Sequence, residues 1–129
     1  MSGRYLLDTN IIIALFAGEK TVLDAAQEAE EIFIPAIVIG ELYYGAENSS
    51  KRQANLTRID SFVEVNVILD CDASTARWYG RVKQELKIKG RPIPENDIWI
   101  AALALHYDLS LVTRDGHFDE ISSLDIRVW

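Results

Sequence analysis

The stretch "RYLLDTN", residues 4–10, decides how the fold of this chain is interpreted. Its apolar centre, "YLL", has the character of a short buried strand, and the strand gives way abruptly to three polar residues that begin with Asp8. The chain then becomes apolar again in "IIIALF", residues 11–16. A carboxylate thus stands at the tip of a core strand, between two hydrophobic segments. The question is what this carboxylate is placed to do.

The composition predicts a single domain, residues 1–129, that resides in the cytoplasm. The chain is long enough to bury a core, and 49% of its residues are hydrophobic and 26% charged, as in ordinary globular proteins. Its longest apolar stretches, such as residues 11–17, are far too short to span a membrane. The single cysteine, Cys71, excludes an internal disulfide framework and a cysteine-rich zinc site. We expect no contact with membranes.

Short apolar segments alternate with helical patterns along the whole chain. The apolar segments are rich in Val, Ile and Leu, as are strands that are buried on both faces. Strands that alternate with helices predict an α/β fold with a parallel sheet covered on both sides. The expected strands are 4–7, 31–34, 65–69, 110–113 and 125–128, and the expected helices, besides one over 11–16, are 21–30, 36–47, 51–62, 73–89 and 96–107, the last with Asn96 as its N-cap.

Four acidic residues stand out by their positions in this pattern. Ligands of open parallel sheets bind beyond the carboxyl ends of the strands, and Asp8 and Asp115 each follow a predicted strand. Glu41 lies inside the apolar helical stretch "AIVIGELYYG", and Asp97 opens the apolar helix "NDIWIAALAL". Each acid alone has an ordinary structural explanation, since Asp8 could cap a helix, Asp97 could complement a helix dipole, Glu41 could point to water and Asp115 could belong to a turn.

Together, the four acids indicate a metal site. Carboxylates gathered in a partly desolvated cleft repel one another, and a fold retains them where a cation neutralises them. Oxygen ligands favour Mg²⁺ or Mn²⁺ over zinc, and no histidine or cysteine is close to these acids in sequence except His117, which follows Asp115 by two residues. We expect His106 and His117 to be surface or core histidines rather than ligands.

Four motifs in order make the chain resemble the PIN-domain nucleases, and among them the VapC toxins of toxin–antitoxin pairs. They are "LLDTNIII" from residue 6, "IGELYYGAENS" from residue 39, "NDIWIAALAL" from residue 96 and "LVTRDGHF" from residue 111. The resemblance covers essentially the whole chain and implies a three-layer α/β/α fold with a short, mostly parallel central sheet. Carried over residue by residue, the acidic quartet of the family falls on Asp8, Glu41, Asp97 and Asp115, and its supporting polar positions fall on Asn10 and Thr113.

The resemblance implies a metal-dependent endoribonuclease that cuts structured RNA such as tRNA or rRNA and inhibits translation. The quartet would hold one or two Mg²⁺ or Mn²⁺ ions, and the products would carry 5′-phosphate and 3′-hydroxyl ends. The chain departs from the family at two points. Many relatives have Asn in place of Asp115, and relatives often have Asp where this chain has His117 before Phe118; here an acid, Asp119, follows instead.

The partners implied by the family are a VapB-like antitoxin and a second copy of the chain. The antitoxin of the family lays an amphipathic helix in a hydrophobic groove and sends a basic side chain into the acidic site. Tyr43, Tyr44, Trp99 and the segment 11–16 offer apolar surface for such a groove, or they simply fill the core. We also expect a homodimer, whose contact surface the sequence leaves unassigned.

The charge distribution of the chain bears on how it would bind RNA. The net charge of −7 is unusual for a protein that grips nucleic acid along its backbone, but basic residues gather between positions 72 and 91. We expect four of them, Arg77, Arg81, Lys83 and Lys87, to track RNA phosphates, although a solvated helix face would look the same. Two alternatives stay open, namely a catalytically silent PIN-like binding or regulatory module and a metal-dependent nuclease that acts on DNA.

Overall fold

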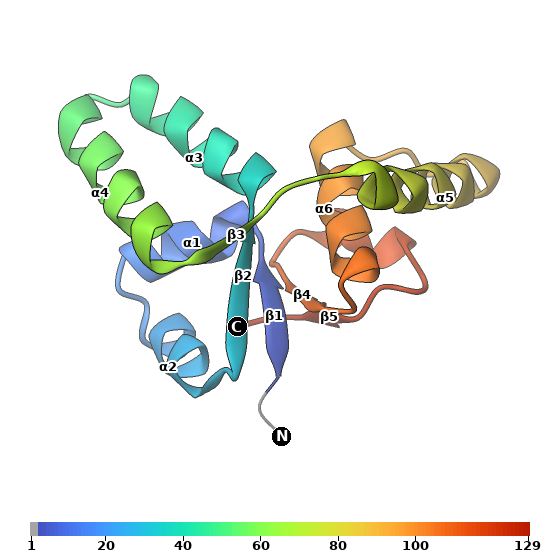
Figure 1. Ribbon diagram of the computed structural model, residues 1–129, viewed down its shortest axis with the longest axis horizontal. Helices are drawn as coiled ribbons and strands as arrows, with labels where there is room; N and C mark the ends of the chain where they lie inside the picture. The colour runs from blue at the N-terminus through green and yellow to red at the C-terminus, as the bar shows by residue number, and fades with distance from the viewer. Residues whose placement is uncertain (1–2) are drawn as a thin grey trace.

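The computed structural model describes residues 3–129 and places five strands in one sheet, in which every neighbouring pair is parallel (Figure 1). The expected parallel α/β architecture is therefore confirmed. The strand order is β3-β2-β1-β4-β5. The bounds are β1 Arg4–Leu7, β2 Glu31–Pro35, β3 Val67–Leu69, β4 Ser110–Val112 and β5 Ile126–Arg127.

Strand β1 is the centre of the sheet and the point where its winding reverses. Leu6 pairs with Phe33 of β2 on one side and with Leu111 of β4 on the other. From β1 the chain builds outward to β2 and β3, and it then crosses back to add β4 and β5 on the opposite side. In open parallel sheets the binding crevice lies at such a reversal, beyond the carboxyl ends of the two strands. Here those strands are β1 and β4.

Helices cover the sheet on both sides (Figure 1). In the view of Figure 1, the helices that lie between β1 and β3 in sequence are on one side of the sheet and those between β3 and β4 are on the other, so the chain has the expected three layers. No helix within residues 3–129 combines the length and the apolar character that crossing a membrane requires. The helix bounds are α1 Thr9–Phe16, α2 Lys20–Glu28, α3 Ala36–Glu47 and α4 Arg52–Val65 on the first side, α5 Ala73–Lys89 and α6 Glu95–His106 on the second, with a 3₁₀ helix, η1, over Gly116–Glu120.

The core explains why α6 is apolar almost all round. Helix α6 contacts α5, α3, β4 and η1, so it has no broad face in water, and Ile100, Ala101 and Leu103 are fully buried. Leu6 and Leu111 of the sheet are also fully buried. Each of these leucine and isoleucine side chains contributes roughly 1.5–3 kcal/mol by leaving water. The same packing holds the first turn of α6 in place beside the sheet.

Several predicted boundaries shift by one to three residues, and two of these shifts have a clear cause. Helix α6 begins at Glu95 after Pro94, so Asn96 is its second residue and caps nothing. Pro94 has an extended backbone, with ψ 144°, and its carbonyl accepts from the backbone N–H of Ile98, so the helix starts immediately after it. The strand expected over 65–69 begins only at Val67, because α4 continues through Val65, whose side chain is largely exposed.

Candidate active site

Asp8 lies at the carboxyl end of β1, where it both caps α1 and faces the crevice. It is 4% exposed, and its carboxylate accepts hydrogen bonds from the Thr9 N–H at 2.8 Å, the Asn10 amide at 3.2 Å and the Thr113 hydroxyl at 2.8 Å. Burial raises the pKa of Asp8, and the hydrogen bond from Thr113 opposes that rise. The carboxylate is thus held rigidly by three donors in a place where its charge is poorly solvated.

Asn10 and Thr113 join the ends of β1 and β4. The Asn10 amide also donates to the Thr113 hydroxyl at 3.4 Å, and its oxygen accepts from the backbone N–H of Arg114 at 3.0 Å. The Thr113 hydroxyl in turn accepts from the backbone N–H of Asp115 at 3.0 Å. Both predicted supporting residues therefore contact Asp8 directly and fix the loop that carries Asp115.

Replacing Thr113 with valine tests this arrangement. Valine has the shape of threonine but cannot donate to Asp8, so we expect catalytic activity to fall about 10- to 100-fold, the usual cost of losing a partner that orients a metal ligand. Thr113→Ser keeps the hydroxyl and should restore most of the activity. Rates measured for both variants beside their thermal melting curves check the prediction, and a fully active Thr113→Val protein would contradict it.

Glu41 approaches the same crevice from α3. The hydroxyl of Thr9 donates to its carboxylate at 3.0 Å. Burial raises the pKa of Glu41, and the negative charges of Asp8 and Asp97 raise it further. Thr9 is a site residue that sequence reasoning missed, although it stands inside the "DTN" motif between two residues that were selected.

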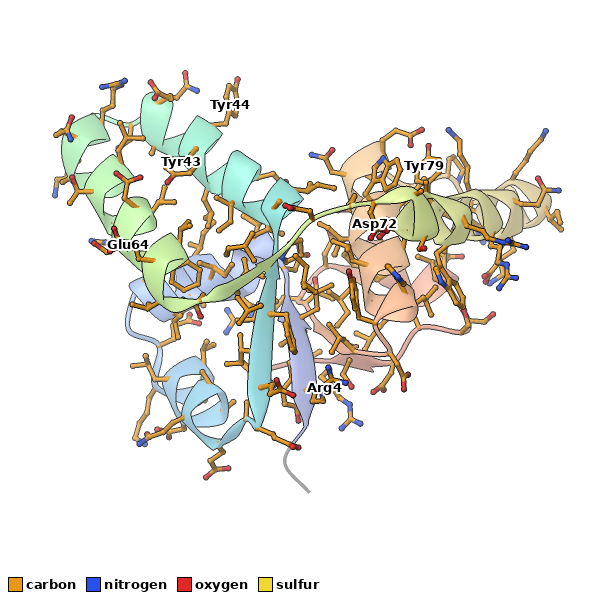
Figure 2. The ribbon with its side chains drawn as sticks, viewed as in Figure 1. Arg4, Tyr43, Tyr44, Glu64, Asp72 and Tyr79 are labelled. Carbon is orange, nitrogen blue, oxygen red and sulfur yellow. The ribbon has the colours of Figure 1, made fainter. Side chains whose placement is uncertain are left out.

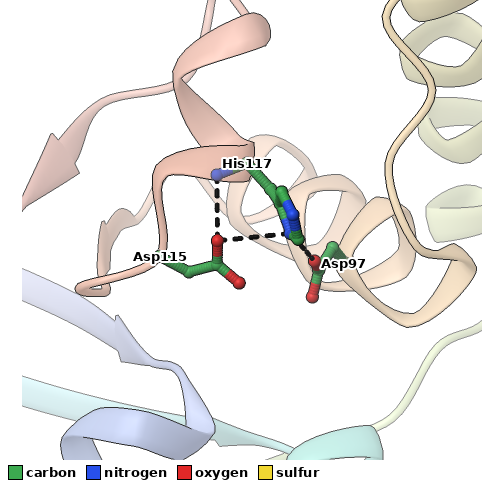
Figure 3. Close-up of side chains that lie close together, drawn as sticks. All are labelled: Asp97, Asp115 and His117. Atoms are coloured by element: carbon green, nitrogen blue, oxygen red, sulfur yellow. Dashed lines mark hydrogen bonds and ion pairs between the residues drawn. The ribbon is translucent and has the colours of Figure 1, made fainter.

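Asp97, Asp115 and His117 complete the crevice (Figure 3). Figure 3 shows the imidazole ring between the two carboxylates, with Nδ1 3.1 Å from Oδ2 of Asp97 and 3.2 Å from Oδ1 of Asp115. The Asp115 carboxylate also accepts from the backbone N–H of His117 at 2.9 Å. Burial raises the pKa of Asp97, the hydrogen bond from His117 opposes it, and the charges of Asp8 and Asp115 add to the rise. His117 was expected to be a surface or core histidine, and the structure places it in the site.

The structure therefore brings all four predicted acids together. Asp8 and Asp115 follow adjacent strands, while α3 supplies Glu41 and the first turn of α6 supplies Asp97. Among residues 3–129, the ion pairs of these acids are those of Asp97 and Asp115 with His117, and no lysine or arginine neutralises the group. Carboxylate oxygens without compensating cations are a donor set that fits a hard divalent ion such as Mg²⁺ or Mn²⁺.

The predicted RNA-binding cations divide between two faces of α5. At 100° per residue, Lys83 lies roughly 120° round the helix axis from Arg77, so the four do not form one strip. Arg81 stacks over the ring of Trp78 at 5.0 Å, and Lys83 pairs with Glu95 at 2.7 Å. Lys83 and Lys87 border a cavity beside the start of α6, whereas Arg77 and Arg81 do not. Contact of these residues with RNA stays a prediction.

A groove of about 380 Å³ lies next to the acidic crevice. The expected segment 11–16 contributes to it, but Tyr43, Tyr44 and Trp99 do not line it. Tyr43 points between α3 and α4, where its hydroxyl donates to Asp60, and Tyr44 projects into solvent from α3 (Figure 2). Trp99 instead stacks on Tyr79 at a centroid distance of 4.3 Å. Residues of α1, α3 and α4 line the groove, among them Thr9, Ile13, Phe16, Glu41, Leu42 and Ile59.

Comparison with known proteins agrees with this geometry. A family model described as PIN domain matches residues 5–124. Ribonuclease VapC2 of Haemophilus influenzae is 35% identical over 129 residues, and the tRNA(fMet)-specific endonuclease VapC of Shigella flexneri is 31% identical over 129; in both cases the match covers 98% of each chain. The crystal structure of VapBC2 from Rickettsia felis bound to a promoter DNA fragment superposes with a TM-score of 0.90, at 31% identity and 98% coverage of both chains. The chain belongs to the PIN-domain family and, within it, to the VapC proteins.

Proposed function

We propose that this protein is a divalent-metal-dependent endoribonuclease and the toxin of a type II toxin–antitoxin pair. The observation that carries the proposal is the convergence of four carboxylates at the reversal point of the sheet, with no lysine or arginine to neutralise them. The names of its relatives, ribonuclease VapC and tRNA(fMet)-specific endonuclease, support RNA as the substrate.

The chain contributes a rigid set of oxygen ligands. Asp8, Glu41, Asp97 and Asp115 would hold the ion, which when bound lowers the pKa of a coordinated water and so supplies hydroxide near neutral pH for attack on a phosphodiester. Three neighbouring hydroxyls and amides orient the ligands. Thr113 and Asn10 fix Asp8, and Thr9 fixes Glu41.

The charge of the protein favours a particular structured RNA over nucleic acid in general. With a net charge of −7, the chain lacks the broad cationic surface that gives strong non-specific binding. Recognition by shape requires only a few well-placed cations, and RNA helices and loops are commonly recognised in this way. Lys83 and Lys87, beside the start of α6, are the best placed of the predicted cations to meet the RNA near the site.

The groove supports a helical antitoxin as the partner. Its walls are mostly apolar, with Ile13, Phe16 and Leu42 among them, and Ile13 is 56% exposed. At one end the groove reaches Thr9 and Glu41, the edge of the acidic crevice. An amphipathic helix could therefore bury its apolar face here and direct a basic side chain toward the acids. VapBC complexes among the similar structures support a VapB-type partner.

Cleavage of a panel of structured RNAs tests the proposed function. Purified antitoxin-free protein should cut one or a few members, total tRNA included, at discrete positions with Mg²⁺ or Mn²⁺, and an excess of chelator should abolish the cutting. Single- and double-stranded DNA of matched length serve as controls. If the protein cut only DNA, DNA would replace RNA as the proposed substrate. If it bound RNA without cutting it, the alternative of a catalytically silent PIN-like binding module would be favoured.

A further inference from the structure

We propose that Nδ1 of His117 is a direct ligand of the divalent ion, beside Asp97 and Asp115, and that this nitrogen gives the site a preference for Mn²⁺ over Mg²⁺. The inference rests on the proposed function, because it concerns the same ion. It goes further in assigning a nitrogen donor to a site whose other expected ligands are all oxygen. The three donor atoms lie within 4.8 Å of one another.

The distances match those between ligands of one ion. Two ligands at right angles around an ion with bonds of about 2.1 Å are roughly 3 Å apart. Nδ1 lies 3.1 Å from the Asp97 oxygen and 3.2 Å from the Asp115 oxygen (Figure 3). An ion could therefore be coordinated by all three atoms with little movement of the side chains.

The turn that carries His117 is well fixed. The residue before the turn, Asp115, accepts from the His117 backbone N–H, and the residue after it, Phe118, is fully buried in the core. The imidazole ring therefore projects from a short segment that is anchored on both sides. The side chain of His117 is 52% exposed, which leaves the far edge of the ring accessible to water.

Ligation would fix the tautomer of His117. As a ligand, Nδ1 would offer its lone pair, and the neutral ring would carry its single proton on Nε2, toward water. Mg²⁺ prefers oxygen ligands, whereas imidazole nitrogen binds first-row transition ions more strongly, so a nitrogen ligand would favour Mn²⁺ over Mg²⁺.

Electron paramagnetic resonance of the Mn²⁺-loaded protein tests the assignment. The chain has two histidines, so a ¹⁴N coupling from an imidazole ligand has two possible sources. The other one, His106, is bonded through Nδ1 to the Thr75 hydroxyl at 2.9 Å and provides the matched control. We expect the coupling in the wild type and in His106→Gln, and its loss in His117→Asn, which offers an oxygen instead.

Binding titrations with each ion alone provide the second readout. His117→Asn should weaken Mn²⁺ binding about tenfold and change Mg²⁺ binding far less, because only the transition ion gains from nitrogen. Bound Mn²⁺ without imidazole coupling in the wild type would overturn the inference and leave the nuclease proposal standing. If the wild type bound no Mn²⁺ at all, or if Asp97→Asn bound it unchanged, the metal assignment of the whole site would fail.

Discussion

Replacing Asp97 with asparagine should lower RNA cleavage by more than about a hundredfold, beyond the usual cost of losing a residue that merely orients a ligand. The same change should raise the melting temperature of the metal-free protein. The pKa of Asp97 is raised in the fold, above all by burial, so its ionised form at neutral pH is held at a free-energy cost. Asparagine keeps the shape and removes the charge. Activity and metal-free stability should therefore move in opposite directions.

Cleavage rates and calorimetric melting of wild type and Asp97→Asn, both stripped of metal before melting, check this prediction. Asp24→Asn is the matched control, because it makes the same chemical change on α2 in a surface ion pair with Lys20. The control should cleave RNA at the wild-type rate. An Asp97→Asn protein that cleaves at full rate would remove Asp97 from the catalytic machinery.

The acidic site should cost the metal-free protein stability as the pH rises from about 4 toward neutrality, and a divalent ion should restore it. The pKa values of Asp8, Glu41 and Asp97 are raised from 3.8, 4.5 and 3.8. The folded state therefore keeps protons on these carboxyl groups at pH values where the unfolded state has released them. Its stability falls as the pH rises through the interval between the unfolded-state pKa values and the raised folded-state pKa values. At a hundredfold excess over its Kd, an ion that binds only the folded state adds about 2.7 kcal/mol, or about 10 °C in Tm.

This pH effect must be measured as a difference. Asp72 and Asp125 have lowered pKa values, set mainly by hydrogen bonds from Thr75 and Ser110, so their stabilisation is lost as the pH falls. This contribution of Asp72 and Asp125 to the pH dependence has the opposite sign, and it is the same in wild type and in the site variants. Subtracting the stability of Asp97→Asn from that of the wild type at each pH therefore removes it. Wild-type stability that rises relative to the variant between pH 4 and 7 would contradict the prediction, as would a metal that stabilises both proteins equally.

The sequence predicted the parts of the fold that have strong local signals. The strand 4–7 and the helices 36–47 and 73–89 agree with the structure, because an apolar run, Pro35 and the Gly90 terminus mark their limits. Gly90 has a φ of 66°, a conformation in which glycine ends a helix readily. The boundary near residue 65 was missed because its valine favours strands by composition and yet ends a helix.

The candidate site was predictable as a set of acids and much less so as a set of contacts. Asp8 and Asp115 could be placed together because adjacent parallel strands bring their carboxyl ends to one edge of a sheet. The contact of Thr9 with Glu41 and that of His117 with Asp97 depend on how α3 and α6 pack, and they join residues 32 and 20 positions apart. The segment 11–16 was assigned to the groove correctly, but Tyr43, Tyr44 and Trp99 were not, since hydrophobic character alone does not reveal which face of a helix is left uncovered.

The bond between Asp8 and Thr113 joins positions 105 apart, and it bears on how a cell survives making this protein. On a ribosome β1 emerges long before its neighbour β4, because two strands and six helices lie between them in the chain. Contacts between residues so distant in sequence form late, because a long loop must close before they stabilise anything. A growing chain therefore lacks a complete acidic cluster until β4 and Asp115 have been synthesised. Until then the proposed metal site cannot assemble, so the nuclease activity that we propose is withheld from the ribosome-bound chain.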